Sequence, residues 1–241
     1  MKPALDPHHY LWHHQSAKRQ WLIALNITAV ITCGLALDAK FGWLGQHLAT
    51  AWTLLVWGGL YRIGSAEERR VLILCTIISG LGELVLSLIW GIYDYQFHNV
   101  PLFVPPGHAL LMTLGLLFAR KLPVAGAWLI TILASVWACY AWIAGFDQFG
   151  VALGLIFLFC MAAGPAKMLY ATMFVLALIM ELYGTALDNW VWLAYAPGLN
   201  LKAANPPFSA GAFYGLLDLL VLAALMLWSK ASPKAKVAAQ I

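Results

Sequence analysis

Residues 71–93 read VLILCTIISGLGELVLSLIWGIY, with Glu83 as the only charged side chain before Tyr93. At about 1.5 Å of rise per residue, a helix of this length crosses the roughly 30 Å hydrocarbon layer of a membrane. The rest of the chain has the same character, since 63% of its residues are hydrophobic, 10% are charged and the mean hydropathy is +0.80. A soluble domain has about 25% charged residues. The sequence therefore predicts an all-α, polytopic integral membrane protein.

Seven further apolar segments have a length near that of a membrane span. Together the eight predicted transmembrane helices cover residues 19–37, 42–61, 71–93, 105–119, 122–144, 149–163, 168–187 and 209–228. The fourth and sixth are short and need flanking residues or tilt to cross the bilayer. We expect a first four-helix half at 19–121, a second at 122–229, and cytoplasmic tails at 1–18 and 230–241.

The lysines and arginines orient these predicted helices. With both termini in the cytoplasm, the outer loops hold only Lys40 and Lys202 of the 14 basic residues. Cytoplasmic loops are enriched in Lys and Arg, so this distribution favours eight spans with both ends inside, and a six- or seven-helix count would scatter it. We expect a multi-pass protein of the bacterial inner membrane.

Two parts of the chain resemble each other. Each begins with a glutamate in an apolar run, has an aromatic-x-aromatic triplet (93–95 and 190–192), and ends its loop with Pro-Pro (105–106 and 206–207). The two parts are four predicted helices apart and so run in the same direction. This pattern predicts a parallel 4+4 repeat, with a site at the interface of the halves.

Acidic residues in and beside the apolar runs are the candidate catalytic groups. An ionisable group in the bilayer centre costs roughly 2.5–3.5 kcal/mol, which favours a functional role. Helical spacing (i, i+4, i+7, i+11) predicts that Glu83, Ser87, Trp90 and Asp94 share one face, and the second half has a similar stripe. As catalytic residues we assign Glu83 and Glu181, which would be acids, and Asp94 and Asp188, which would orient them or activate water.

The protonation of these carboxyl groups follows from their surroundings. The predicted spans offer Glu83 no cation, so we expect it to be neutral and able to donate a proton, with Asp94 returning protons from the outer surface. The alternative is a neutral carboxyl that only hydrogen-bonds a neighbouring helix.

Aromatic residues gather at the outer ends of the same helices. Interfacial belts of Trp and Tyr explain such residues without any site, but aromatic faces also stabilise cations. His108 follows a Pro-Pro-Gly turn, where it is placed to relay a proton or hold a substrate, or to make a structural hydrogen bond. The candidate substrate-binding residues are Trp90, Tyr93, Tyr95, His108, Trp190, Trp192 and Asp218.

Other chemistries find little support in the sequence. The four cysteines lie within apolar runs, without a Cys-x-x-Cys pair or a spacing typical of metal ligands. Histidines occur at 8, 9, 13 and 14 in the predicted N-terminal tail. The 9 and 13 pair is four residues apart and could share a metal on a helix, but we interpret the tail as solvated. The net charge of +4 reflects a shortage of acid rather than a basic patch, so we expect no nucleic-acid partner. We also expect no cofactor and no metal.

The loop after Glu83 carries a family resemblance. It contains Gly91-x-Tyr93-x-Tyr95 and then Asn99-Val100-Pro101. Over about 30 residues this resembles the membrane hydratases of carotenoid biosynthesis, which have Gly-Val-Pro at the last position and a Trp after their proline, where this chain has Gly107-His108. More loosely, the chain is similar to small integral-membrane terpene cyclases in length and in its membrane carboxylates. Both resemblances imply protonation of an isoprenoid alkene.

We therefore expect an integral membrane enzyme that acts on a lipophilic, isoprenoid-like substrate by carboxylate acid–base chemistry, such as hydration or cyclisation. Its expected partners are this substrate and the membrane lipid. One alternative is a proton- or cation-coupled small-molecule transporter of parallel-repeat type, with the same carboxylates as ion sites. Another is a non-catalytic membrane assembly subunit.

Overall fold

The computed structural model describes residues 11–12 and 14–231. The chain is all-α, with 75% of it helical and four short strands among the described residues. The helices are α1 (Ala17–Ile63), α2 (Ala66–Glu83), η2 (Leu84–Ile89), α3 (Val104–Ala119), α4 (Val124–Ile143), α5 (Phe149–Ala163), α6 (Lys167–Ala186), η3 (Phe208–Ala210) and α7 (Gly211–Ala231). The strands are β1 (Tyr93–Tyr95), β2 (Trp190–Trp192), β3 (Tyr195–Ala196) and β4 (Leu201–Lys202).

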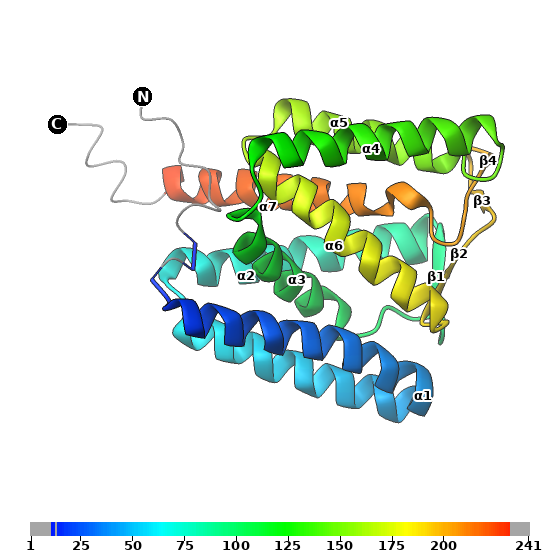
Figure 1. The fold of residues 1–241 in the computed structure, drawn as a ribbon. Helices are drawn as coiled ribbons and strands as arrows, with labels where there is room; N and C mark the ends of the chain where they lie inside the picture. The colour runs from blue at the N-terminus through cyan, green and yellow to red at the C-terminus, as the bar shows by residue number, and fades with distance from the viewer. Residues whose placement is uncertain (1–10, 13, 232–241) are drawn as a thin grey trace.

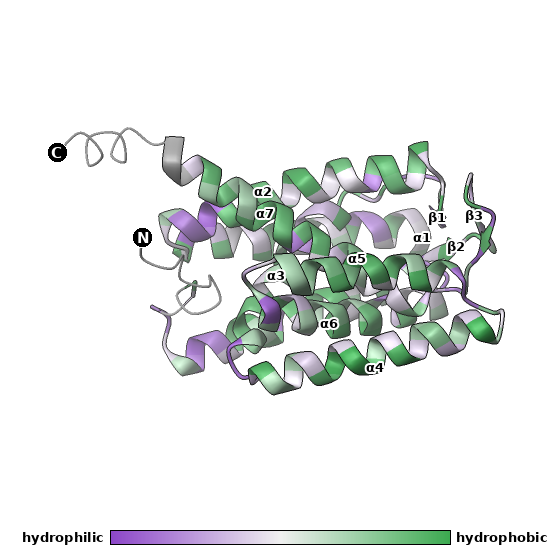
Figure 2. Ribbon diagram, turned by 90° about the horizontal axis from the view of Figure 1, so that it is seen from above, coloured by the Kyte–Doolittle hydropathy of each residue, from purple (hydrophilic) through white to green (hydrophobic). Residues whose placement is uncertain are grey.

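Five helices in the described part of the chain are long and apolar enough to cross a membrane. They are α1, α2 together with η2, α4, α6, and α7 with η3, while α3 and α5 are shorter apolar helices. Their outward faces carry aliphatic side chains such as Leu55, Ile89 and Ile143, which are 75–84% exposed. Figure 2 shows hydrophobic residues along the helices and hydrophilic ones near their ends. This distribution is the one expected of a protein that lies in lipid.

α1 consists of two helical halves joined at a sharp break. Gly42 has φ 56° and ψ −133°, a backbone conformation that a residue without Cβ adopts readily. The chain reverses there, and a Cβ placed on Gly34 in the first half would lie 3.7 Å from the Ala49 Cβ in the second. Figure 1 shows the two halves as adjacent blue and cyan helices. The break falls at the start of the second predicted segment, 42–61.

α2 begins earlier than the apolar pattern predicts. The Ser65 hydroxyl accepts from the Glu68 N–H at 3.3 Å, and the Glu68 carboxylate accepts from the Ser65 N–H at 2.6 Å. This capping box pairs N–H groups that a helix start otherwise leaves open. Residues 66–70, although charged, therefore form the first turn of α2 rather than a loop.

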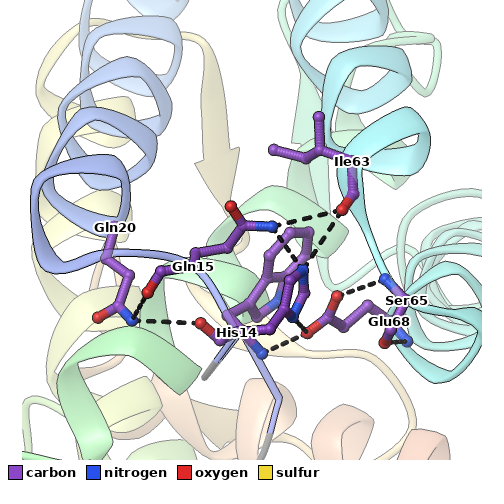
Figure 3. A network of polar contacts seen from close by, with 7 residues as sticks. His14, Gln15, Gln20, Ile63, Ser65 and Glu68 are labelled. Atoms are coloured by element: carbon purple, nitrogen blue, oxygen red, sulfur yellow. Dashed lines mark hydrogen bonds and ion pairs between the residues drawn. The ribbon is translucent and has the colours of Figure 1, made fainter.

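The first described residues, Leu11 and Trp12, pack back onto the start of α2 instead of lying in solvent as expected, whereas His14 is exposed; residues 1–10 and 13 of the predicted tail lie outside the described residues. Leu11 and Trp12 are each 1% exposed. The Trp12 backbone N–H donates to the buried Glu68 carboxylate, and His14 Nδ1 lies 3.5 Å from the same side chain. Figure 3 shows the resulting network.

Two strand pairs, which the sequence pattern did not predict, lie at the end of the bundle opposite the start of α1 and the end of α7 (Figure 1). β3 pairs with β4 inside the loop before α7. β1 pairs antiparallel with β2 in the register Tyr93↔Trp192, Asp94↔Val191 and Tyr95↔Trp190. The β1–β2 ladder therefore joins the loops that follow α2 and α6.

α2, α3, α6 and α7 form the centre of the bundle. α2 packs against α3 and α7, and α6 also packs against α3 and α7. Residues 109–117 of α3 are all buried. α1 covers α3, and α5 covers α7. This packing, with the β1–β2 ladder, brings the last turns of α2 and α6 into one region of the molecule.

Candidate active site

Glu83 is the last residue of α2, and its buried carboxyl group faces β1. The Tyr93 and Tyr95 hydroxyls donate to Glu83 Oε2 at 2.7 and 2.8 Å. Alternate residues of a strand point to one face, which is why residues 93 and 95 reach the same oxygen. Burial, followed by the charge of Glu83, raises the pKa of both phenols well above their usual 10. The phenols therefore remain protonated donors.

Glu181, in α6, has a closely similar setting. The Trp190 and Trp192 indole N–H groups of β2 donate to Glu181 Oε2 at 2.8 and 3.0 Å. The Tyr214 hydroxyl, from α7, lies 3.2 Å from Glu181 Oε1. Each strand of the β1–β2 ladder thus binds the glutamate of the helix that precedes it.

The two settings differ by one residue of spacing. Tyr93 follows Glu83 by 10 positions, whereas Trp190 follows Glu181 by 9. η2, directly after Glu83, is a π-helix, whose wider turns take up the additional residue. α6 instead continues as an α-helix to Ala186. Such π-helical turns are frequent at functional sites.

His108, in α3, supplies Glu83 with a partner that can carry positive charge, which corrects the expectation that no other span offers one. His108 Nε2 lies 3.4 Å from Glu83 Oε1, and His108 Nδ1 lies 2.9 Å from the Val104 carbonyl oxygen. A carbonyl only accepts, so Nδ1 carries a hydrogen. Nε2 is therefore the ring nitrogen that faces Glu83 Oε1.

The His108 ring also stacks on Tyr214, with centroids 5.0 Å apart and planes at 8°. Tyr214 contacts Oε1 of Glu181, and His108 contacts Oε1 of Glu83. In both glutamates, therefore, Oε2 is held by a strand and Oε1 faces the same stacked pair of rings.

All of these side chains line one cavity of about 440 Å³. Small-molecule sites typically enclose roughly 300–1,000 Å³. The remaining wall is mainly aliphatic and comes from α1, α2, α3, α6 and α7. It includes Leu81 of α2, Val85 of η2 and Leu220 of α7, which are 47–59% exposed. The cavity thus reaches the outward surface of these helices.

Three predicted site residues lie in the loops at the strand end of the bundle, away from this cavity. Asp94 is on the opposite face of β1 from the two tyrosines; its side chain is 48% exposed and contacts His98. Asp188 is exposed in the turn after α6. The Trp90 indole donates to the Pro197 carbonyl at 2.8 Å. None of these three predicted residues is part of the cavity wall.

Asp218 is buried in α7, one turn after Tyr214, and is also separate from the cavity wall. Neither of its carboxylate oxygens has a hydrogen-bond partner among the described residues. The structure therefore brings together Glu83, Glu181, His108 and the two aromatic triplets, and leaves the aspartates outside.

Tyr214 is the site residue that the sequence pattern missed. Alignment of the two Pro-Pro pairs places His108 two positions after Pro106, and the matching position after Pro207 is Ser209. Ser209 lies in the 3₁₀ turn η3, which precedes α7, and the residue of α7 that contacts Glu181 in the cavity is Tyr214 instead. The available signal was the i, i+4 spacing between Tyr214 and Asp218 on one face of a helix.

The described residues contain no group of three His, Cys, Asp or Glu side chains that could hold a metal ion. His8, His9 and His13 lie outside the described residues. Comparison of the chain with protein-family models, with characterised proteins and with solved structures finds no match.

Proposed function

We propose that this protein is an integral membrane enzyme that protonates an alkene of a lipophilic, isoprenoid-like substrate. The observation that carries the proposal is the cavity in which two glutamates, Glu83 beside His108 and Glu181 beside two indoles and a phenol, face a mainly aliphatic space. General acid–base catalysis needs one group that keeps its proton and another that accepts one. The two glutamates are suited to divide these roles.

Glu181 is the proposed proton donor. The described groups that hydrogen-bond its carboxyl group are two indoles and a phenol, and a buried carboxylate without a cation is costly. Its Oε2 accepts from two indole N–H groups, which can only donate. The acidic proton therefore belongs on Oε1, the oxygen beside Tyr214.

The Glu83–His108 pair is the proposed proton acceptor. In the proposed step the Glu181 O–H bond breaks, and the proton and the alkene π electrons form a C–H bond. Water then adds to the carbocation in a hydration, and the resulting oxonium loses a proton. In a cyclisation a second alkene of the same chain attacks the carbocation, and the new carbocation loses a proton from a neighbouring C–H bond to form an alkene. The proton that either route releases passes to the Glu83–His108 pair and returns to Glu181 past Tyr214.

We also propose eight membrane crossings in two parallel four-helix halves, with both termini cytoplasmic. The break of α1 at Gly42 and the two shorter apolar helices support the count. The similar settings of Glu83 and Glu181 support the repeat. The register of β1 and β2 also supports it, because a half-turn about the Asp94–Val191 pair exchanges the two strands and leaves their pairing unchanged. The resemblance of residues 83–105 to carotenoid hydratases supports the reaction class.

Incorporation of solvent deuterium tests the function. Full-length protein in lipid nanodiscs is incubated in D₂O with geraniol, squalene or lycopene, and the products are analysed by mass spectrometry. Each proposed route leaves deuterium on carbon.

Gly107→Leu should block the reaction, because a Cβ at Gly107 enters open space in the cavity wall. Gly59→Leu, on the exposed face of α1, is the matched control. Full incorporation by Glu181→Gln would overturn the proposed donor.

A further inference from the structure

The ionisable groups of the cavity wall are unbalanced in charge. Two carboxyl groups, Glu83 and Glu181, line it, and the described lining residues include no Lys or Arg. The single His108 is placed against Glu83. A ligand with one positive charge would therefore meet a carboxyl group without a protein cation beside it, at Glu181.

The aromatic rings of the two strands, which belong to the same wall, are inclined to one another. Tyr93 and Trp192 have centroids 4.9 Å apart with planes at 53°, and Tyr95 and Trp190 are edge-on at 6.0 Å. Phe213 continues the wall, parallel to Trp192 within 13° at 6.5 Å. Rings at several inclinations around one space offer faces to a rounded cation, which aromatic faces attract.

The wall that α1 supplies to the cavity is suited to a hydrocarbon chain. It consists of Val30, Ile31, Gly34, Leu35 and Ala49, with Thr53 as its one hydroxyl residue. A ligand with a charged head at the carboxyl groups and a branched aliphatic tail along α1 would match both parts of the cavity.

From these observations we propose that the cavity binds a lipophilic organic cation, an ammonium head on an isoprenoid-like chain, between the aromatic rings and the two glutamates. The proposal deepens the proposed function, on which it rests, because a carbocation formed in that reaction has the charge and rounded shape of such a head. The ammonium compound is a stable mimic of this intermediate.

A matched pair of probes tests the proposal. Geranyl-trimethylammonium is compared with its neutral isostere, in which a quaternary carbon replaces the nitrogen. Binding to the full-length protein in nanodiscs is measured by calorimetry, with empty nanodiscs subtracted. We expect the ammonium probe to bind about tenfold more tightly than its isostere. The preference should disappear in Glu83→Gln/Glu181→Gln and persist in Glu67→Gln, which removes an exposed carboxylate at the start of α2.

The outcomes separate this proposal from the proposed function. Equal binding of both probes, or no binding of either, overturns the cation site, whereas the deuterium assay still decides the enzyme activity. A preference that survives in the double variant also overturns it. Preferential, glutamate-dependent binding without deuterium incorporation supports the cation site and overturns the enzyme assignment in favour of cation binding or transport.

Discussion

Tyr93 lies directly opposite Trp192 in the β1–β2 ladder, and each reaches back to the glutamate of its own helix. Their ring centroids are 4.9 Å apart. The pair of rings therefore connects the surroundings of Glu83 to those of Glu181. A substitution at either residue is expected to act on both carboxyl groups.

Removal of either carboxyl group, the donor Glu181 or the acceptor Glu83, should remove activity while the fold is kept. Glu83→Gln and Glu181→Gln preserve shape and most hydrogen bonding, and each should lower deuterium incorporation by about 10²-fold or more, the scale of general acid–base catalysis. Glu67→Gln serves as the exposed control. Full turnover by Glu83→Gln, with unchanged thermal unfolding, would leave that residue a structural role only.

The stability of the protein should fall at high pH because of the two phenols. Burial raises the pKa of Tyr93 and Tyr95 above its unfolded value, so their contribution is complete below about pH 10 and declines as the pH rises further. Thermal unfolding between pH 8 and 11 measures this slope. Tyr93→Phe/Tyr95→Phe should lower stability at neutral pH by about 1–3 kcal/mol per lost donor and flatten the alkaline decline. Parallel pH profiles for the two proteins would contradict the assignment.

Two glycine substitutions should have effects of opposite sign. A Cβ on Gly184 would lie 2.0 Å from Trp190 Cη2, so Gly184→Ala must displace the indole from Glu181. We expect a loss of about 1–3 kcal/mol and reduced activity. A Cβ on Gly59 meets no atom within 4 Å, and Gly59→Ala should gain up to about 1 kcal/mol from helix propensity. Thermal unfolding compares the two, and a neutral Gly184→Ala would contradict the close packing of Trp190.

Reporter fusions test the proposed topology. A reporter after Gln148 or Leu199 should lie outside, because both positions fall in loops at the end that carries the strands. Reporters after Lys121 or Lys167 should lie inside. A cytoplasmic reading after Gln148 would remove α5, one of the two shorter apolar helices, from the set of crossings.

The sequence predicted the two glutamates and both aromatic triplets as site residues. A lone acid in an apolar run is conspicuous because its burial is costly, and the repeated spacing connects each acid to its triplet. The partnership of Glu83 with His108 joins α2 to α3, and no pattern within one helix reports such a contact.

Asp94 shows where periodicity misleads. The predicted stripe from Glu83 to Asp94 assumes a continuous α-helix, but η2 widens the turns after Glu83. Gly91, with φ 69°, then turns the chain into β1. Tyr93 and Tyr95 consequently take the inward direction, and Asp94 points away from them.

The β1–β2 ladder also bears on how the protein must move. Its backbone pairing holds four of the hydrogen-bond donors in place before any ligand arrives, so charge that develops at either carboxyl group meets dipoles that need little reorganisation. The same pairing makes a wide hinge opening at this end expensive, because strand hydrogen bonds would have to break. Breathing motions that admit and release a ligand are therefore expected among the helices, where Leu81, Val85 and Leu220 line the cavity and are partly exposed. Exchange with the surroundings would then be lateral, through the plane of the bilayer.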